Sequence, residues 1–282
     1  MNNIRIIPRL DIKGPNLVKG IHLEGLRVLG TPEDFAKYYY ENGADELIFQ
    51  DIVASLYERN SLHDIVSRTA KNIFIPLTVG GGLRTIDDIN NVLRAGADKV
   101  SINTGAVRNK SFIREASRKF GSSTIVVAIE AIKQANGEYY CFIDNGREET
   151  GIEVTAWTRE IEELGAGELI ITSVDREGTG EGFDIDLIKK ITSNVNIPVI
   201  AHGGAGSMEN IKSAVHAGAD GLAIATVFHY KTINEISNTH NAGSEGNTTF
   251  LKSNTSRKIA NVYHINDVKQ YLQDNEISCR RS

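Results

Sequence analysis

Cysteine is scarce in this chain, which carries only Cys141 and Cys279 among its 282 residues. The two cysteines lie far apart and form no CxxC motif. The sequence therefore argues against a disulfide framework or a zinc site, and it suits a reducing compartment. We accordingly expect no metal and no cofactor.

Long apolar runs and basic runs are also lacking. No stretch approaches the roughly 18 consecutive apolar residues that a membrane-spanning helix needs, and the N-terminal residues show no secretory signal pattern. The net charge is −5, and apart from Arg280 and Arg281 at the C-terminus there is no basic cluster of the kind that binds nucleic acid. We therefore expect a soluble cytoplasmic protein with neither a membrane nor a nucleic-acid partner.

The chain does contain a regular alternation of short apolar runs with amphipathic stretches. Runs that are apolar along their whole length are typical of parallel strands covered on both faces. The candidate strands are 4–11, 46–51, 75–79, 99–103, 124–130, 168–173, 197–201 and 221–226. Helical patterns such as 32–43 and 85–96 lie between them, each closed by a glycine. This order predicts an α/β protein with a closed (β/α)₈ TIM barrel, although periodicity alone also permits an open doubly wound sheet.

An internal repeat favours the closed barrel. Residues 75–104 align without gaps onto residues 197–226, and the two segments share their paired glycines and an AGAD turn. At the same offset, residues 43–51 match residues 165–173. The chain therefore consists of two related halves of four strand–helix units each. We expect residues 1–282 to form one barrel with a twofold half-barrel repeat.

Two segments depart from this regularity. Residues 14–30 are long for a connection between the first strand and its helix, and they contain four glycines. Long loops at this end of a barrel often act as lids, so we predict a mobile loop. Residues 231–262 are rich in Asn, Ser, Thr and Gly, which is typical of a flexible excursion before a last helix near residues 265–273.

Two carboxylates occupy equivalent positions at the ends of strands. Asp11 ends the first strand and Glu130 ends the fifth, where side chains of a barrel face the active site. The repeat places the two on opposite sides of the mouth, and such a pair supplies a general acid and a general base. The alternative is that each carboxylate only caps a neighbouring loop.

Glycine-rich loops follow the third and seventh strands, each before a helix. Glycine lets the backbone approach a ligand closely, and amides at a helix N-terminus attract phosphate. Each half therefore offers one phosphate-binding loop set, which we call a cradle, and two cradles predict a bis-phosphorylated substrate. The predicted phosphate-binding residues are Gly82, Asn103 and Thr104 in the first cradle, and Gly178, Gly204, Ala225 and Thr226 in the second.

Other polar residues fall at one or the other end of the strands. We place Lys19, Asp51, Thr78, Asp175, Glu177 and His202 at the rim of the active site. At the opposite end, the strand starts carry Arg5, Glu46, Lys99 and Glu168. These two positive and two negative side chains predict a ring across the barrel bottom. On physics alone such a ring is an ion-pair plug that leaves no buried charge unpaired.

Together these residues resemble the HisF family, the cyclase subunits of imidazole glycerol phosphate synthase. The resemblance covers roughly residues 4–230, and its most specific stretches are GADELIFQDI, IPLTVGGGLR, RAGADKVSINT, ELGAGELIITSVDREGTGEGFD and IPVIAHGGAG. It implies a lyase and cyclase that converts the bis-phosphate PRFAR and ammonia into imidazole glycerol phosphate and AICAR in histidine biosynthesis. It assigns Asp11 as general acid and Glu130 as general base.

The resemblance also implies a partner. In this family a separate glutaminase subunit, of the HisH type, docks on the N-terminal face of the barrel and sends ammonia down the barrel axis. The ring of Arg5, Glu46, Lys99 and Glu168 then matches the family's charged gate to the ammonia channel.

Several positions depart from the family pattern. Glu130 stands where aspartate is usual, and Arg9 stands where the residue is normally small and neutral. His202 replaces a small residue and Glu177 replaces an aspartate. These changes suit a shifted substrate, as in paralogues that use ammonia to build acetamidino groups in bacterial surface-sugar pathways. A barrel that binds phosphate without catalysis is a further alternative.

Overall fold

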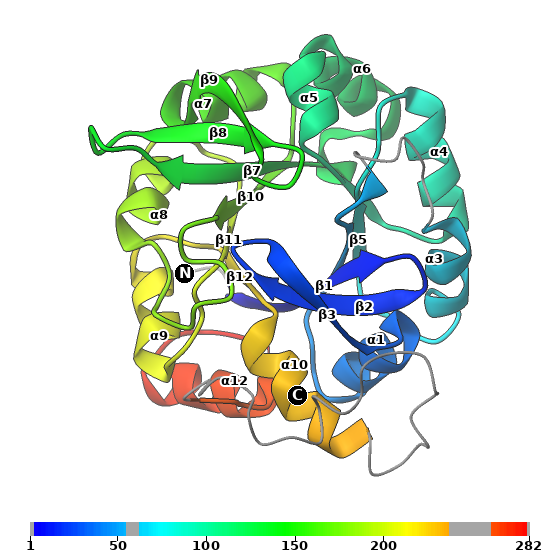
Figure 1. Cartoon of the computed structure of the whole chain (residues 1–282), viewed down its shortest axis with the longest axis vertical. Helices are drawn as coiled ribbons and strands as arrows, with labels where there is room; N and C mark the ends of the chain where they lie inside the picture. Colours follow the sequence, from blue (N-terminus) through cyan, green and yellow to red (C-terminus); the bar gives the residue numbers. More distant parts are fainter. Residues whose placement is uncertain (1–2, 55–61, 237–260, 281–282) are drawn as a thin grey trace.

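A closed parallel barrel forms the centre of the computed structural model, which describes residues 3–54, 62–236 and 261–280 (Figure 1). Each barrel strand pairs in parallel with its neighbours, and β1 pairs with both β4 and β12, so the ring is complete. The barrel strands are β1 (Arg5–Lys13), β4 (Leu47–Asp51), β5 (Leu77–Gly80), β6 (Lys99–Ile102), β7 (Ile125–Lys133), β10 (Glu168–Ser173), β11 (Val199–His202) and β12 (Gly221–Ile224). The TIM barrel and all its predicted strands are confirmed, and the open sheet is excluded.

Helices surround the ring of strands (Figure 1). Their apolar faces pack against the outward side chains of the strands in one large core. The helices are α1 (Pro32–Glu41), α3 (His63–Thr69), α4 (Ile86–Ala95), α5 (Thr104–Arg108), α6 (Ser111–Phe120), η1 (Ser122–Thr124), α7 (Val154–Leu164), α8 (Ile185–Thr192), α9 (Met208–His216), α10 (Thr226–Ile236) and α12 (Ile265–Asp274). Within the described ranges, no helix is both long and apolar enough to cross a bilayer.

The twofold repeat is visible in side-chain contacts as well as in sequence. Asp98 accepts a hydrogen bond from the amide of Leu77 at 2.9 Å, and its duplicate Asp220 accepts one from the amide of Val199 at 2.9 Å. α4 and α9, which occupy equivalent places in the two halves, both begin with a capping box. The same local interactions therefore fix the same units in each half.

Side chains that point into the barrel form layers. Because strand side chains alternate between the two faces, residues two apart on one strand belong to successive layers. An apolar layer is formed by Ile7, Ile48, Val126, Ile170, Ile200 and Ala223. Arg5, Glu46 and Glu168, each two residues earlier, lie on the bottom side of this layer, and the mouth lies beyond its other side.

Antiparallel hairpins extend two of the strands, a feature that the sequence analysis missed. β2 (Asn16–Ile21) and β3 (Glu24–Gly30) continue from β1, and β8 (Tyr139–Ile143) and β9 (Glu148–Glu153) continue from β7. Both hairpins are in the foreground of Figure 1, on the face to which the strands' carboxyl ends lead. The segment 14–30 thus has regular structure where a loop was expected, and its predicted mobility stays a prediction.

The segment 231–262 was predicted to be a flexible excursion. Residues 231–236 complete α10 instead, and residues 237–260 lie outside the described residues. The last helix agrees with the prediction, since α12 spans Ile265–Asp274.

Candidate active site

A polar layer lies between the apolar interior and the mouth of the barrel. It is one step beyond the apolar layer on the same strands, and its members are Arg9, Gln50, Ala128, Thr172, His202 and Ala225. Arg9, Thr172 and His202 are each at most 5% exposed. The floor of the mouth therefore carries buried polar side chains, the setting in which charge interactions are strong.

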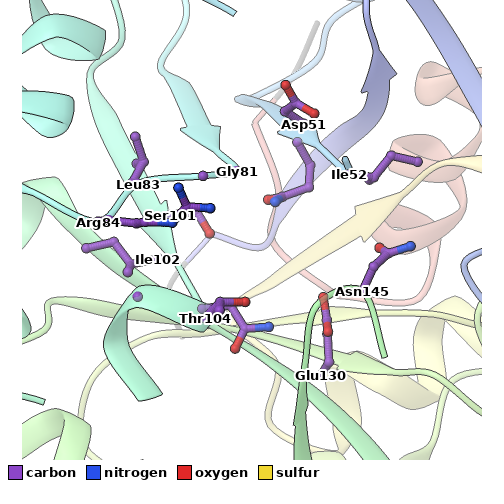
Figure 2. A pocket seen from close by; sticks show the side chains of 14 residues that line it. Asp51, Ile52, Gly81, Leu83, Arg84, Ser101, Ile102, Thr104, Glu130 and Asn145 are labelled. Carbon is purple, nitrogen blue, oxygen red and sulfur yellow. The ribbon is translucent and has the colours of Figure 1, made fainter. Parts of the chain in front are cut away.

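One pocket opens on the side of the first cradle (Figure 2). Gly82, Asn103 and Thr104 all line it, as predicted from the sequence, and Glu130 and Asn145 complete the wall. In Figure 2, Glu130 and Thr104 border the same hollow from different elements, with Asp51 at its far side. The Thr104 hydroxyl is also 3.4 Å from an Asp144 carboxylate oxygen in the turn between β8 and β9.

A second, smaller pocket lies on the side of the second cradle. Its lining includes all the predicted residues of that cradle, Gly178, Gly204, Ala225 and Thr226, together with Glu177 and His202. Thr226 is the first residue of α10, so the amides that open this helix border the pocket. The structure thus groups each predicted cradle in a pocket of its own.

Glycine is required in the second pocket for reasons of space. Gly204 has a φ of +96°, and a Cβ at this position would lie 2.1 Å from the carbonyl oxygen of Gly182. Gly178 has a φ of +72°, and a Cβ there would lie 2.7 Å from the carbonyl oxygen of Gly20 in β2. Both loops pack so closely that any side chain would force them apart.

Glu130 has an unusual protonation equilibrium. Desolvation of the carboxyl raises its pKa from the ordinary 4.5 to about 7, against the opposing effects of the Gly146 amide, the Arg9 charge and Asn103. The nearby Asp144 raises the pKa further. A carboxyl with a pKa near neutrality exchanges protons readily in both directions at physiological pH.

Asp11 lies in a buried cluster of charges. It is 3% exposed and accepts a hydrogen bond from Nε of Arg9 at 2.9 Å, while Nζ of Lys19 is 3.9 Å from its other oxygen. Lys19 also pairs with Glu177, which is 1% exposed. The two cations and two anions balance in charge, as burial requires.

Glu177 also fixes the hairpin β2–β3 over the mouth. Its Oε2 accepts from the amide of Leu23 at 2.9 Å, and its backbone carbonyl accepts from the amide of His22 at 3.0 Å. His22 and Leu23 have φ angles of 50° and 62°, a left-handed turn that non-glycine residues rarely adopt. Through these contacts the hairpin tip is attached to the loop that follows β10.

The remaining rim residues lie in different places. Asp51 lines the first pocket, is 3% exposed and accepts a hydrogen bond from the amide of Val53 at 3.0 Å. Thr78 is 1% exposed within β5 and pairs in register with Lys99 at the start of β6, outside the linings of both pockets. Asp175 is exposed and accepts from the amide of Lys133 at 2.9 Å, so it fixes a loop outside both pockets.

The predicted ring at the barrel bottom is present. Nη1 of Arg5 lies 2.9 Å from Glu46 and 2.6 Å from Glu168. Nζ of Lys99 lies 3.1 Å from each of the same two glutamates. Each cation therefore contacts both anions, and the four side chains close into a continuous ring. We call this set the bottom ring.

Sequence reasoning missed one candidate, Ser101. Its hydroxyl is buried in β6, lines the first pocket and has no hydrogen-bond partner in the part of the chain that the structure describes. A buried hydroxyl without a partner is costly, so a ligand in the pocket would gain by bonding to it. The sequence could have indicated this residue, because Ser101 lies midway between Lys99 and Asn103 and therefore shares the inward face of β6 with them.

Known proteins resemble this chain along most of its length. A family model described as "Histidine biosynthesis protein" matches residues 5–234. The "Imidazole glycerol phosphate synthase subunit HisF" of Legionella pneumophila is 56% identical over 209 residues, covering 74% of this chain and 99% of the relative. Those of Alkaliphilus metalliredigens and Endomicrobium trichonymphae are 47% and 48% identical, covering 81% and 84% of this chain and 91% and 92% of the relatives. The chain therefore belongs to the HisF family of imidazole glycerol phosphate synthase subunits.

Proposed function

We propose that this chain is the ammonia-dependent cyclase subunit of an imidazole glycerol phosphate synthase. It would convert PRFAR and ammonia into imidazole glycerol phosphate and AICAR. The observation that carries the proposal is the pair of pockets at the mouth, one on each half of the barrel, each lined by a predicted phosphate cradle. A substrate with a phosphate at each end would span the mouth between them.

The substrate's reacting centre would then lie between Asp11 and Glu130. β1 and β7 are on opposite sides of the eight-stranded ring, so the two carboxylates face the mouth from opposite walls. We assign Asp11 as general acid, which requires its carboxylate to take up a proton before it acts, and Glu130 as general base. The pKa of about 7 suits Glu130 to accept a proton at neutral pH and to release it again.

Ammonia would enter from the opposite face, supplied by a glutaminase subunit. The bottom ring closes the barrel at this end, and in the proposed function it serves as the gate. The N-terminal face also carries Phe74, a residue that is 80% exposed and lines a hollow with Ile73, Pro76 and Asp98. An exposed aromatic next to a hollow is typical of a protein–protein interface. We propose that the glutaminase docks there.

The surface-sugar paralogue is the second candidate. The substitutions Arg9, Glu130, Glu177 and His202 favour it. The relatives from Legionella pneumophila, Alkaliphilus metalliredigens and Endomicrobium trichonymphae, however, all bear the name of the histidine-pathway enzyme. The non-catalytic barrel is less well supported, since Asp11, Glu130 and the bottom ring are all present. The cytoplasmic location stays a prediction.

Turnover of PRFAR with ammonium salts tests the proposal without a glutaminase. We expect imidazole glycerol phosphate and AICAR as products. The variant Glu130→Asp then separates the two enzymes. It should raise PRFAR turnover if Glu130 marks divergence toward another substrate, and it should lower turnover if glutamate is part of a histidine enzyme. Absence of turnover in the unmodified protein, under conditions where PRFAR binds, would exclude the proposed reaction.

A further inference from the structure

Arg9 connects residues from three strands at the floor of the mouth. Its Nε donates to Asp11 on its own strand at 2.9 Å. Its Nη1 is 3.2 Å from the hydroxyl of Thr172 on β10 and 3.1 Å from Nδ1 of His202 on β11. The guanidinium therefore reaches across the interior past β12, the strand that separates β1 from β11.

The partners on the far side are arranged to accept this cation. Burial, reinforced by the charges of Arg9 and Lys19, holds the pKa of His202 well below its usual value, so the ring is neutral and Nδ1 accepts. The hydroxyl of Thr172, 3.2 Å from the same Nδ1, also accepts a hydrogen bond from Arg9. Two polar side chains thus hold one end of the guanidinium while its Nε holds Asp11.

We infer that Arg9 is a positioning residue of this site: anchored by Thr172 and His202, it fixes the carboxylate of Asp11 and supplies a positive charge that acts on Glu130. The inference rests on the proposed function, because it assigns Arg9 a role in the acid–base pair of that reaction. It also gives one physical reason for two departures from the family pattern. Arg9 and His202 lie 193 positions apart in the chain, yet they are in contact.

A lysine would not replace this arginine. The planar guanidinium directs Nε and Nη1 toward different partners at once, whereas an ammonium is a point charge on a flexible stem. An arginine that is 5% exposed also needs its hydrogen bonds, because a buried charge without partners is strongly unfavourable. Replacing Arg9 by lysine therefore separates the effect of its positive charge from the effect of its hydrogen-bond geometry.

The charge of Arg9 acts on Glu130 together with groups from other elements. Arg9 lowers the pKa of Glu130, as do the Gly146 amide and Asn103, whereas burial and Asp144 raise it. Removing the positive charge should therefore raise the pKa of Glu130 further. Replacement by lysine should leave it nearly unchanged.

Three variants test the inference. Arg9→Met removes the guanidinium and its charge but keeps an unbranched apolar stem. Arg9→Lys keeps the charge without the planar guanidinium, and Arg68→Met is the control. Arg68 is also paired with a carboxylate, Glu33, but on the outside of the barrel. Should Arg9→Met fail to fold, the neutral and polar Arg9→Gln replaces it in the comparison.

We expect Arg9→Met to lower kcat with ammonium about 10- to 100-fold, because a small displacement of a catalytic group costs this much. KM for the bis-phosphate should change little, since the cradles are on other loops. The pH at which kcat reaches half its maximum should rise by about one unit in Arg9→Met, as expected for loss of a nearby opposite charge. In Arg9→Lys, kcat should fall while that pH stays near its original value.

A second readout needs no substrate. The pKa of the Glu130 side chain, followed by carboxyl ¹³C NMR and assigned with Glu130→Gln, should be higher in Arg9→Met than in Arg9→Lys or Arg68→Met. An unchanged kcat in Arg9→Met would overturn the inference, and so would a reduced kcat without any change in this pKa. If the unmodified protein turns over no bis-phosphate, the proposed function fails, while the NMR comparison still decides whether Arg9 acts on Glu130.

Discussion

The amide of Gly146 donates a hydrogen bond of 2.8 Å to Oε2 of Glu130, so the turn of the β8–β9 hairpin binds the carboxylate at the end of β7. This bond favours the charged form, but desolvation outweighs it and the pKa reaches about 7. The folded protein therefore holds this proton more tightly than the unfolded chain does.

The first prediction concerns stability against pH. The stabilising effect of the proton on Glu130 is complete below the ordinary pKa of 4.5 and is lost as the pH rises through about 7. Unfolding by urea at a series of pH values should show a decline in stability between these limits that Glu130→Gln lacks. If the free energy of unfolding changed with pH in the same way in the unmodified protein and in Glu130→Gln, the Glu130 carboxyl would have an ordinary pKa.

The second prediction concerns the acid–base pair. Asp11→Asn and Glu130→Gln remove a titratable proton with little change in shape, and general acid–base catalysis is worth a factor of about 10² to 10⁴. Each variant should lose at least the lower of these factors in PRFAR turnover with free ammonia, while substrate binding persists. Full activity in both variants would show that the carboxylates only cap loops.

The third prediction concerns the second cradle. Gly204→Ala places a methyl group 2.1 Å from the carbonyl oxygen of Gly182 and forces the two loops apart. Since a hydrogen bond to a charged group is worth roughly 1.5–3 kcal/mol, KM for the bis-phosphate should rise about tenfold or more. Gly180→Ala is the matched control, because Gly180 also has a positive φ, of 73°, but has no atom within 4 Å of an added Cβ. Equal KM values in the two variants would argue against this cradle.

The fourth prediction concerns the bottom ring. Lys99→Ala breaks the contacts to Glu46 and Glu168 that the lysine makes at 3.1 Å. If the ring is a gate, glutamine hydrolysis by the partner should lose its coupling to product formation, while turnover with free ammonia is retained. Lys110→Ala, which breaks a surface pair with Glu160, should leave both unchanged. Equal loss of the two activities in Lys99→Ala would indicate an ion-pair plug.

The fifth prediction concerns the docking face. Phe74→Ser should weaken glutaminase binding about 30-fold or more, the loss expected for an aromatic that dominates an interface. Val28→Ser is the control, because Val28 is an exposed apolar residue on β3, on the mouth side. Isothermal titration with the purified glutaminase gives both affinities. Equal affinities for the two variants would place the partner on another face.

The barrel strands and the two cradles could be predicted because they depend on local or repeated patterns. Strand β10, for example, contains the apolar run Leu169–Ile171 and repeats β4 at the offset of the two halves. Gly82 and Gly204 could be found in the same way, since each follows a strand and precedes a helix. Their places in the two pockets follow from the register of a parallel barrel.

The hairpins and the buried cluster could not be predicted in this way. The segment 14–30 reads as a loop because its strands carry glycines and charges, and only pairing of β2 with β1 makes them regular. The contact of Arg9 with His202 depends on the crossing of the interior by a long side chain, which strand alternation does not encode. Asp175 was placed at the rim from its position after a strand, and its hydrogen bond from the amide of Lys133 is a tertiary contact that this position does not encode.

Closure of the barrel joins strands from the two ends of the chain, because β1 pairs with β12. The C-terminal tail reinforces this seam: the amide of Ile4 donates to the carbonyl of Ser278 at 2.8 Å, and Lys269 on α12 pairs with Asp45 at 2.7 Å. A nascent chain that has not yet released these residues from the ribosome has β1 and β12 as open edges, and open edges pair readily with other chains. The strand and the helix that complete this seam, β12 and α12, are therefore translated after all the other barrel strands.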